Sequence, residues 1–270
     1  MTTFTLYKNA WINNRPPHKH EKLSRSEIVR LLAGGGYFVR NTYDFDSSDE
    51  KQFWYVIKDQ FEGMEELSSK MRNQVKKSLK TYDVERISPD EFRRIALPIY
   101  HAAQEAYRVK ASLSRQEDID RLALQGKDFW AVYTKEEHKP VAVAINTVTR
   151  DDTQWHGCCE YNTMKCDPQY QHNSTYPYYG LIYEMNRYYL EEMNLGYVND
   201  GARSLTEHSN IQGFLIDKFH FRRACCKLQI AYKWYVGLAV KILFPFRWLI
   251  RKPQVAAILR QEAWARGLEK

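Results

Sequence analysis

Three apolar runs between residues 128 and 163 are typical of consecutive β-strands. They are DFWAVYT, PVAVAINTVT and TQWHGCCEYN, with turn residues near Glu136-Glu137 and Asp151-Asp152. This pattern predicts an antiparallel meander. The runs YYGLIYEMNRYYLEEMN, YVND, NIQGFLIDKF and FRRACCKLQIAYKW follow, and they indicate helix, strand, helix and strand. Helices between strands require crossovers and some parallel pairing, so we expect an α/β fold with a mixed, mostly antiparallel sheet flanked by helices.

Helix starts upstream carry capping signals. Ser24 pairs with Glu27, Ser88 precedes Pro89, and Ser114 pairs with Glu117. Two strands are expected around GYFVRNTYDF and KQFWYVIKD, followed by a helix over MEELSSKMRNQVKKSLKTY. That helix is rich in lysine, which favours a solvated face over a site for a polyanion. We expect three segments: a sheet extension with the basic helix (1–83), a core (84–235) and an amphipathic helical tail (236–270).

Composition limits the classes of partner. The 270 residues carry a net charge of +7, which favours anionic partners. The basic residues are spread along the chain without a recognition motif, so a nucleic-acid binder is the least favoured class. The five cysteines show neither zinc-ligand spacing nor a disulfide framework. We expect reduced thiols in a cytoplasmic protein, with no metal and no redox cofactor.

The order of elements from Val84 to Trp234 resembles the GNAT acyltransferase fold. The segment LSSKMRNQVKKSLKTYDVERI is similar to the basic helix and first strand of its Fem-type, BioF2-like branch. The segment NIQGFLIDKFHFRR is similar to the late helix and the x-F-G-F corner of GNAT proteins, with His220 where glycine is usual. The resemblance implies an N-acyltransferase that transfers an acyl group to an amine acceptor, such as a bacterial envelope or polysaccharide precursor.

The resemblance leaves the acyl donor open. GNAT enzymes bind the pyrophosphate of coenzyme A through an R/Q-x-x-G-x-G/A loop before the central helix. The corresponding stretch here is QYQHNSTYPYYG, which lacks the glycines. Fem-type relatives also lack the loop, and several use aminoacyl-tRNA. The donors are therefore acyl-CoA or, for a Fem-like aminoacyltransferase, aminoacyl-tRNA; a GNAT-shaped binding protein without catalysis is a further alternative.

Candidate site residues gather in DGARSLTEHSNIQGFL, residues 200–215, after an expected strand end. Acyl transfer to an amine needs a base and a donor for the tetrahedral oxyanion. We assign the base to Glu207 or His208, and Tyr161 is a third catalytic candidate. The expected substrate-binding residues are Asp200, Arg203, Ser204, Asn210, Glu160, Tyr178 and Tyr179. The alternative reading is a polar turn in which Ser209 or Asn210 only caps the next helix.

The tail contains the apolar and basic run YVGLAVKILFPFRWLIRKPQ, residues 235–254. Its charges and Pro245 interrupt it too often for a membrane span. It suits either a membrane interface, with Trp and Phe inserted and Lys and Arg near head groups, or packing on the domain or on a partner. Interface binding would place the protein peripherally at the inner face of the membrane, with a lipid-linked amine as acceptor.

Overall fold

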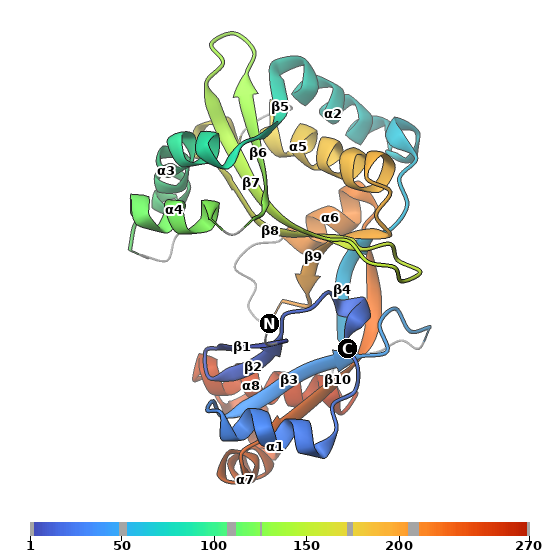
Figure 1. Cartoon of the computed structure of the whole chain (residues 1–270), viewed down its shortest axis with the longest axis vertical. Helices are drawn as coiled ribbons and strands as arrows, with labels where there is room; N and C mark the ends of the chain where they lie inside the picture. Colours follow the sequence, from blue (N-terminus) through green and yellow to red (C-terminus); the bar gives the residue numbers. More distant parts are fainter. Residues whose placement is uncertain are drawn as a thin grey trace. The chain divides into compact units, whose positions relative to one another are not determined.

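The computed structural model describes residues 3–48, 53–106, 112–124, 126–171, 175–204 and 211–268 (Figure 1). The chain divides into two compact units. The first contains residues 1–56, 202–211 and 222–270, and the second contains 57–201 and 212–221. These boundaries differ from the expected ones at 83/84 and 235/236, because the last strand and the tail belong with the N-terminal strands.

The second unit contains the expected meander. Its strands are β5 (Tyr82–Ile87), β6 (Asp128–Thr134), β7 (Pro140–Thr149), β8 (Cys158–Cys166) and β9 (Tyr197–Ala202). They lie in the order β9-β8-β7-β6-β5. The pairs β5–β6, β6–β7 and β7–β8 are antiparallel, and β8–β9 is parallel. The crossover helix between β8 and β9 makes this parallel pair possible.

Helices cover both faces of these strands. They are α2 (Ser69–Thr81), α3 (Pro89–Glu105), α4 (Gln116–Ala123), α5 (Pro177–Asn186) and α6 (Ile211–Phe219). Shorter helical segments are η2 (Gly63–Glu66), η3 (Pro168–Tyr170) and the π-helix η5 (Arg187–Glu192). Figure 1 shows α2 beside α5, and α3 beside α4.

The helix caps follow the sequence at two of three positions. Ser24 and Glu27 form a capping box, and the Ser88 hydroxyl accepts from the Glu91 N–H. The expected cap at Ser114 is wrong: α4 begins at Gln116, and the Asp118 carboxylate accepts from the Arg115 N–H. Ser114 instead contacts the end of α3, where its hydroxyl accepts from the Gln104 amide at 3.1 Å.

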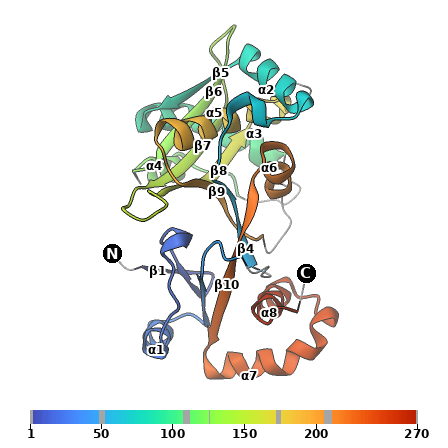
Figure 2. The ribbon, with the colours of Figure 1, turned by 90° about the vertical axis from the view of Figure 1, so that its right-hand side faces the viewer.

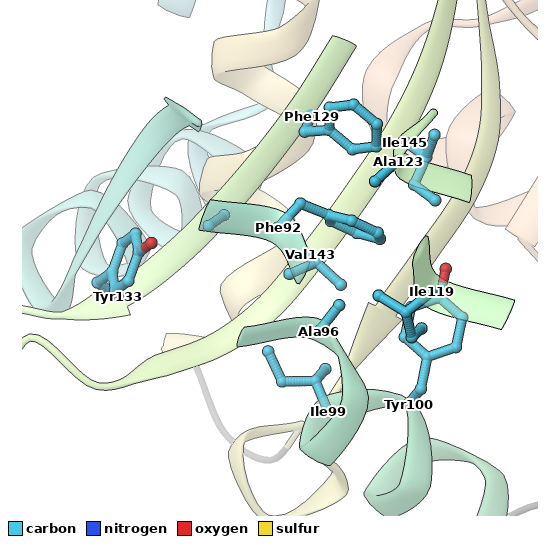
Figure 3. Packing of buried hydrophobic residues seen from close by; sticks show 11 residues of the cluster. Phe92, Ala96, Ile99, Tyr100, Ile119, Ala123, Phe129, Tyr133, Val143 and Ile145 are labelled. Atoms are coloured by element: carbon cyan, nitrogen blue, oxygen red, sulfur yellow. The ribbon is translucent and has the colours of Figure 1, made fainter. Parts of the chain in front are cut away.

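β6 and β7 are buried on both faces, and β6 shows why. Its alternate residues Phe129, Ala131 and Tyr133 join a cluster with α3 and α4, while Trp130 points to the opposite side and bonds Tyr189. Figure 3 shows the cluster, in which the rings of Phe92 and Phe129 are tilted with centroids 4.6 Å apart. The sequences of β6 and β7 are thus continuously apolar because both faces of these strands are covered by other parts of the unit.

The first unit is a smaller mixed sheet. Its strands are β1 (Phe4–Tyr7), β2 (Ala10–Asn13), β3 (Phe38–Tyr43), β4 (Phe53–Lys58, with residues 57 and 58 in the second unit) and β10 (Arg222–Tyr232). The order is β1-β2-β3-β10-β4. The pairs β1–β2 and β3–β10 are antiparallel, and β2–β3 is parallel. β1 and β2 were not expected from the sequence.

The tail is helical, as expected. It contains α7 (Trp234–Leu243), η6 (Phe244–Leu249) and α8 (Pro253–Ala265), while α1 (Arg25–Ala33) and η1 (Pro17–Lys19) complete this unit. Figure 2 shows α1 on one side of β10 and α8 on the other. Within the described ranges, no helix combines the length and apolarity that crossing a membrane requires.

The corner after α6 adopts the backbone of a glycine corner. His220, between Phe219 and Phe221, has a φ of 56°. This is the left-handed region that glycine favours and other residues rarely adopt. The conformation at His220 therefore matches the corner that the sequence resemblance indicated, although the residue is not glycine.

Candidate functional site

The parallel strands β8 and β9 pair over a short distance and then separate. The ladder joins Cys158 to Tyr197, Cys159 to Val198 and Glu160 to Asn199. Beyond Glu160, β8 continues to Cys166 and β9 continues to Ala202 with no further pairing between their described residues. A fork therefore opens in the second unit, and Glu160 and Asp200 lie at its base.

The two carboxylates at the fork affect one another. Burial raises the pKa of Asp200 to about 7, and the charge of Glu160 adds to the rise. The Glu160 side chain reaches solvent, but the surrounding protein removes part of its water, and this desolvation raises the pKa of Glu160. The positive charge of Lys127 partly opposes the rise. A carboxyl with a pKa near neutral is suited to accept a proton at physiological pH.

A β-bulge reorients β8 at the same point. Ile145 pairs with Thr163 and Asn146 pairs with Tyr161, so Asn162 is an extra residue in the strand. Tyr161 is buried, and its hydroxyl donates to Asn186 Oδ1 at 2.8 Å. Burial raises the pKa of Tyr161 well above its ordinary value, so this hydroxyl stays protonated. Tyr161 therefore joins the fork to α5.

A buried polar cluster centres on Tyr189, whose ring centroid lies 6.2 Å from that of Tyr161. The Tyr189 hydroxyl accepts from Trp130 Nε1 at 2.8 Å and from Asn146 Nδ2 at 3.2 Å, and it donates to Asp128 Oδ2 at 3.2 Å. Tyr189 belongs to the π-helix η5, where the extra residue per turn changes the direction of the side chains. Three hydrogen bonds at the Tyr189 hydroxyl restrict this side chain to one arrangement.

Sequence reasoning missed Asn199, which lies opposite Glu160 in the ladder. Its Oδ1 accepts from the Gly201 N–H at 2.9 Å, while its buried Nδ2 has no acceptor within the described ranges. Buried donors are rarely left unpaired, so Nδ2 retains an unused capacity to donate a hydrogen bond. The only signal in the sequence was an asparagine inside the short run YVND. This signal is weak because polar residues are common at strand ends.

The structure distributes the predicted residues over several places. Glu160, Tyr161 and Asp200 meet at the fork. Tyr178 and Tyr179 lie in the first turn of α5, where the Tyr179 ring packs on Phe214 with centroids 5.7 Å apart. Glu207, His208 and Asn210 lie outside the described residues.

Arg203 and Ser204 belong to the first unit. The Arg203 guanidinium lies 4.2 Å from the centroid of the Trp264 ring and 5.7 Å from that of Trp54. Its backbone N–H donates to the Trp54 carbonyl at 2.8 Å. Arg203 is thus held by aromatic stacking within that unit.

Two solved structures have the same arrangement over nearly their whole length. One is L-PGS from Bacillus licheniformis, with a TM-score of 0.55 and 12% identity, covering 98% of this chain and 86% of that one. The other is the C-terminal domain of a putative lysylphosphatidylglycerol synthetase from Agrobacterium fabrum, with a TM-score of 0.52 and 12% identity, covering 89% and 84%. The fold is GNAT-like.

Two other comparisons complete the picture. FemX, at 12% identity and a TM-score of 0.47, covers 77% of this chain and 68% of its own. No protein-family model matches the sequence, and no curated protein matches it. The GNAT-like fold is therefore visible in structure and not in sequence identity.

Proposed function

We propose that this protein is an acyltransferase that transfers an acyl group to an amine acceptor at the β8–β9 fork. The observation that carries the proposal is the position of Asp200, a carboxyl with a pKa near 7, where two parallel strands separate. Ligands of open mixed sheets bind at such points of divergence. Solved structures with this fold include the synthetases named above, which also supports the assignment.

Asp200 is the proposed base. It takes the proton from the acceptor ammonium, and the free amine nitrogen then attacks the carbonyl carbon of the acyl donor. A carbon–nitrogen bond forms, and the bond between that carbon and its leaving group breaks. The nitrogen then loses its second proton, and the leaving group takes up a proton, both exchanged through solvent. Glu160 keeps the Asp200 pKa high by its charge, so that the base is matched to neutral pH.

Asn199 is the proposed oxyanion donor. Its Nδ2 is buried and unpaired within the described part of the chain, so it can bond a developing negative charge without first giving up another partner. Tyr161 has a positioning role, since its hydroxyl is occupied by Asn186. From the sequence, Glu207 and His208 remain alternative candidates for the base, and Asn210 remains a candidate substrate contact.

The donor is proposed to be either acyl-CoA or aminoacyl-tRNA. Calorimetric titration with acetyl-CoA and with aminoacylated tRNA tests the two separately, because binding of tRNA weakens steeply with salt. We expect one of them to bind and to lose its acyl group to a primary amine. Binding of neither donor would contradict the transferase proposal and leave a GNAT-shaped binding protein.

The proposed acceptor is an amine at an anionic lipid surface. Residues 233–252, here called the aromatic–basic face, contain five cationic residues and no acid. The exposed residues Trp234, Leu238 and Ile242 recur every four positions along α7, and Trp248 and Leu249 in η6 are 71% and 69% exposed. Val240 of α7 and Phe244 of η6 pack instead against Leu259 and Ala263 of α8. Exposed apolar side chains rimmed by cations suit the interface of an anionic bilayer.

A further inference from the structure

The first unit contains a partly buried arginine that forms no ion pair with an acid among the described residues. Arg40 lies on β3, and its guanidinium donates to Gln261 Oε1 on α8 at 3.4 Å. In the described portion of this unit, the acids that form ion pairs do so with other residues. The pairs are Asp46 with Arg222, Asp44 with Lys227 and Glu262 with Arg266. A buried charge with no counter-charge is costly to the fold.

A second unpaired donor lies on the same helix face. Trp264 follows Gln261 by three residues on α8, so the two side chains point the same way. Trp264 is 4% exposed, and its Nε1 is buried with no acceptor among the residues described. A buried indole N–H usually has a hydrogen-bond partner.

Gln261 connects these two donors. Its Oε1 accepts from the Arg40 guanidinium, and it lies one helical turn before Trp264 on α8. The Trp264 ring lies 6.0 Å from that of Phe53. Arg203 stacks on the Trp264 ring at 4.2 Å and brings a second positive charge. Arg40 retains partial access to solvent, so a ligand can reach it.

We propose that Arg40 and the Trp264 indole N–H bind a phosphate group, with Arg203 supplying additional positive charge above the indole. Arginine offers paired N–H groups that match the oxygens of a phosphate. Such a group would provide the missing counter-charge and the missing acceptor together. This site is independent of the carboxylates at the fork, and it suits either a free phosphate monoester or the phosphodiester of a lipid head group.

Thermal unfolding with inorganic phosphate, against chloride at matched ionic strength, tests the proposal. We expect phosphate to raise the Tm of the full chain in a saturable way. Arg40→Met and Trp264→Phe should each weaken the apparent affinity about tenfold or more, because each removes one donor to a charged group. Arg25→Met, at an exposed position in α1, is the matched control and should keep the wild-type response.

The variants are chosen to fold. Trp264→Phe keeps a ring and removes only the N–H, and Arg40→Met removes a buried unpaired charge. In chloride, Arg40→Met should therefore match or exceed the wild-type Tm.

Replacing phosphate by a soluble glycerophosphodiester identifies the source of the phosphate group. Tighter binding of the diester indicates a lipid head group, and tighter binding of phosphate indicates a monoester. Any of three results would overturn the proposal. They are an equal rise in Tm with phosphate for wild type and Arg40→Met, a Tm that no phosphate ligand raises, and a large fall in the Tm of Arg40→Met in chloride.

Discussion

Glu160 and Asp200 lie on neighbouring parallel strands at the point where the strands separate, and the charge of Glu160 helps to raise the pKa of Asp200 to about 7. Two neighbouring carboxyl groups that are partly shielded from water do not readily ionise at the same time, because their negative charges repel each other. The arrangement therefore yields one carboxyl that exchanges its proton near neutral pH. The following expectations depend on this fork and on the elements that support it.

The raised pKa of Asp200 should make stability depend on pH. The folded state holds the Asp200 proton up to a pH of about 7, whereas an unfolded aspartate loses it near pH 3.9. The contribution is therefore fully present below about pH 4 and is lost as the pH rises to about 7. Asp200→Asn should be more stable than wild type at pH 8 by on the order of 2–4 kcal/mol, and nearly equal at pH 4. Urea unfolding at both pH values measures this difference, and equal stability at pH 8 would argue against the raised pKa.

The Tyr189 hydroxyl should be important for stability. Tyr189→Phe leaves Trp130 Nε1 without its acceptor and leaves Asn146 Nδ2 with only the Met185 sulfur, which should reduce the free energy of unfolding by about 2–4 kcal/mol. Tyr188→Phe is the matched control, because Tyr188 is only partly buried and its ring stacks with Arg86. Chemical denaturation should show a small effect for the control. Similar losses for both variants would contradict the assigned network.

The left-handed backbone at His220 should discriminate between substitutions. His220→Gly accepts a φ of 56° without strain, whereas a β-branched residue does not. We expect His220→Gly to stay within about 1 kcal/mol of wild type and His220→Val to lose about 1–3 kcal/mol. Equal stability of the two variants in guanidinium unfolding would show that the corner does not require this backbone.

The aromatic–basic face should bind anionic vesicles. Wild type should float with vesicles that contain an anionic phospholipid, and Trp234→Ser with Trp248→Ser should lose most of this binding because both rings are exposed. Leu124→Ser is the matched control, since Leu124 is 75% exposed in the second unit. Replacing Lys241 and Arg247 by glutamine should weaken binding by about 1 kcal/mol per charge.

Two results would contradict this membrane role. One is equal flotation of wild type and the double tryptophan variant. The other is a concentration-dependent dimer, seen by light scattering, that the double variant abolishes, because it would show that a second copy of the chain covers the face.

Much of the second unit could be predicted because its signals are local. The runs of β6 to β8 are long and continuously apolar, and Ser88 before Pro89 is a strong helix start. β1 and β2 were missed because each has only four residues. They gain stability from pairing with each other, and β2 also pairs with β3. Ser114 failed as a cap because it bonds Gln104 on another helix, a contact that local sequence does not reveal.

The site was predictable only in part. Glu160, Tyr161 and Asp200 could be placed near a strand end from the sequence. The separation of β8 from β9 depends on where a tertiary ladder stops, and the role of Asn199 depends on an unpaired atom. Tyr189 falls in the run YYGLIYEMNRYYLEEMN, for which the sequence predicts only a helix, and its three polar partners lie 43 to 61 residues away in the chain.

The pH dependence of acyl transfer tests the role of Asp200 most directly. With a donor that binds and a primary amine as acceptor, the rate should rise with pH and level off above about 7, as Asp200 becomes able to accept a proton. Asp200→Asn should lose on the order of 10²–10⁴-fold in rate together with that inflection. A variant that folds, binds the donor and keeps both the wild-type rate and the inflection would contradict the assignment of Asp200 as the base.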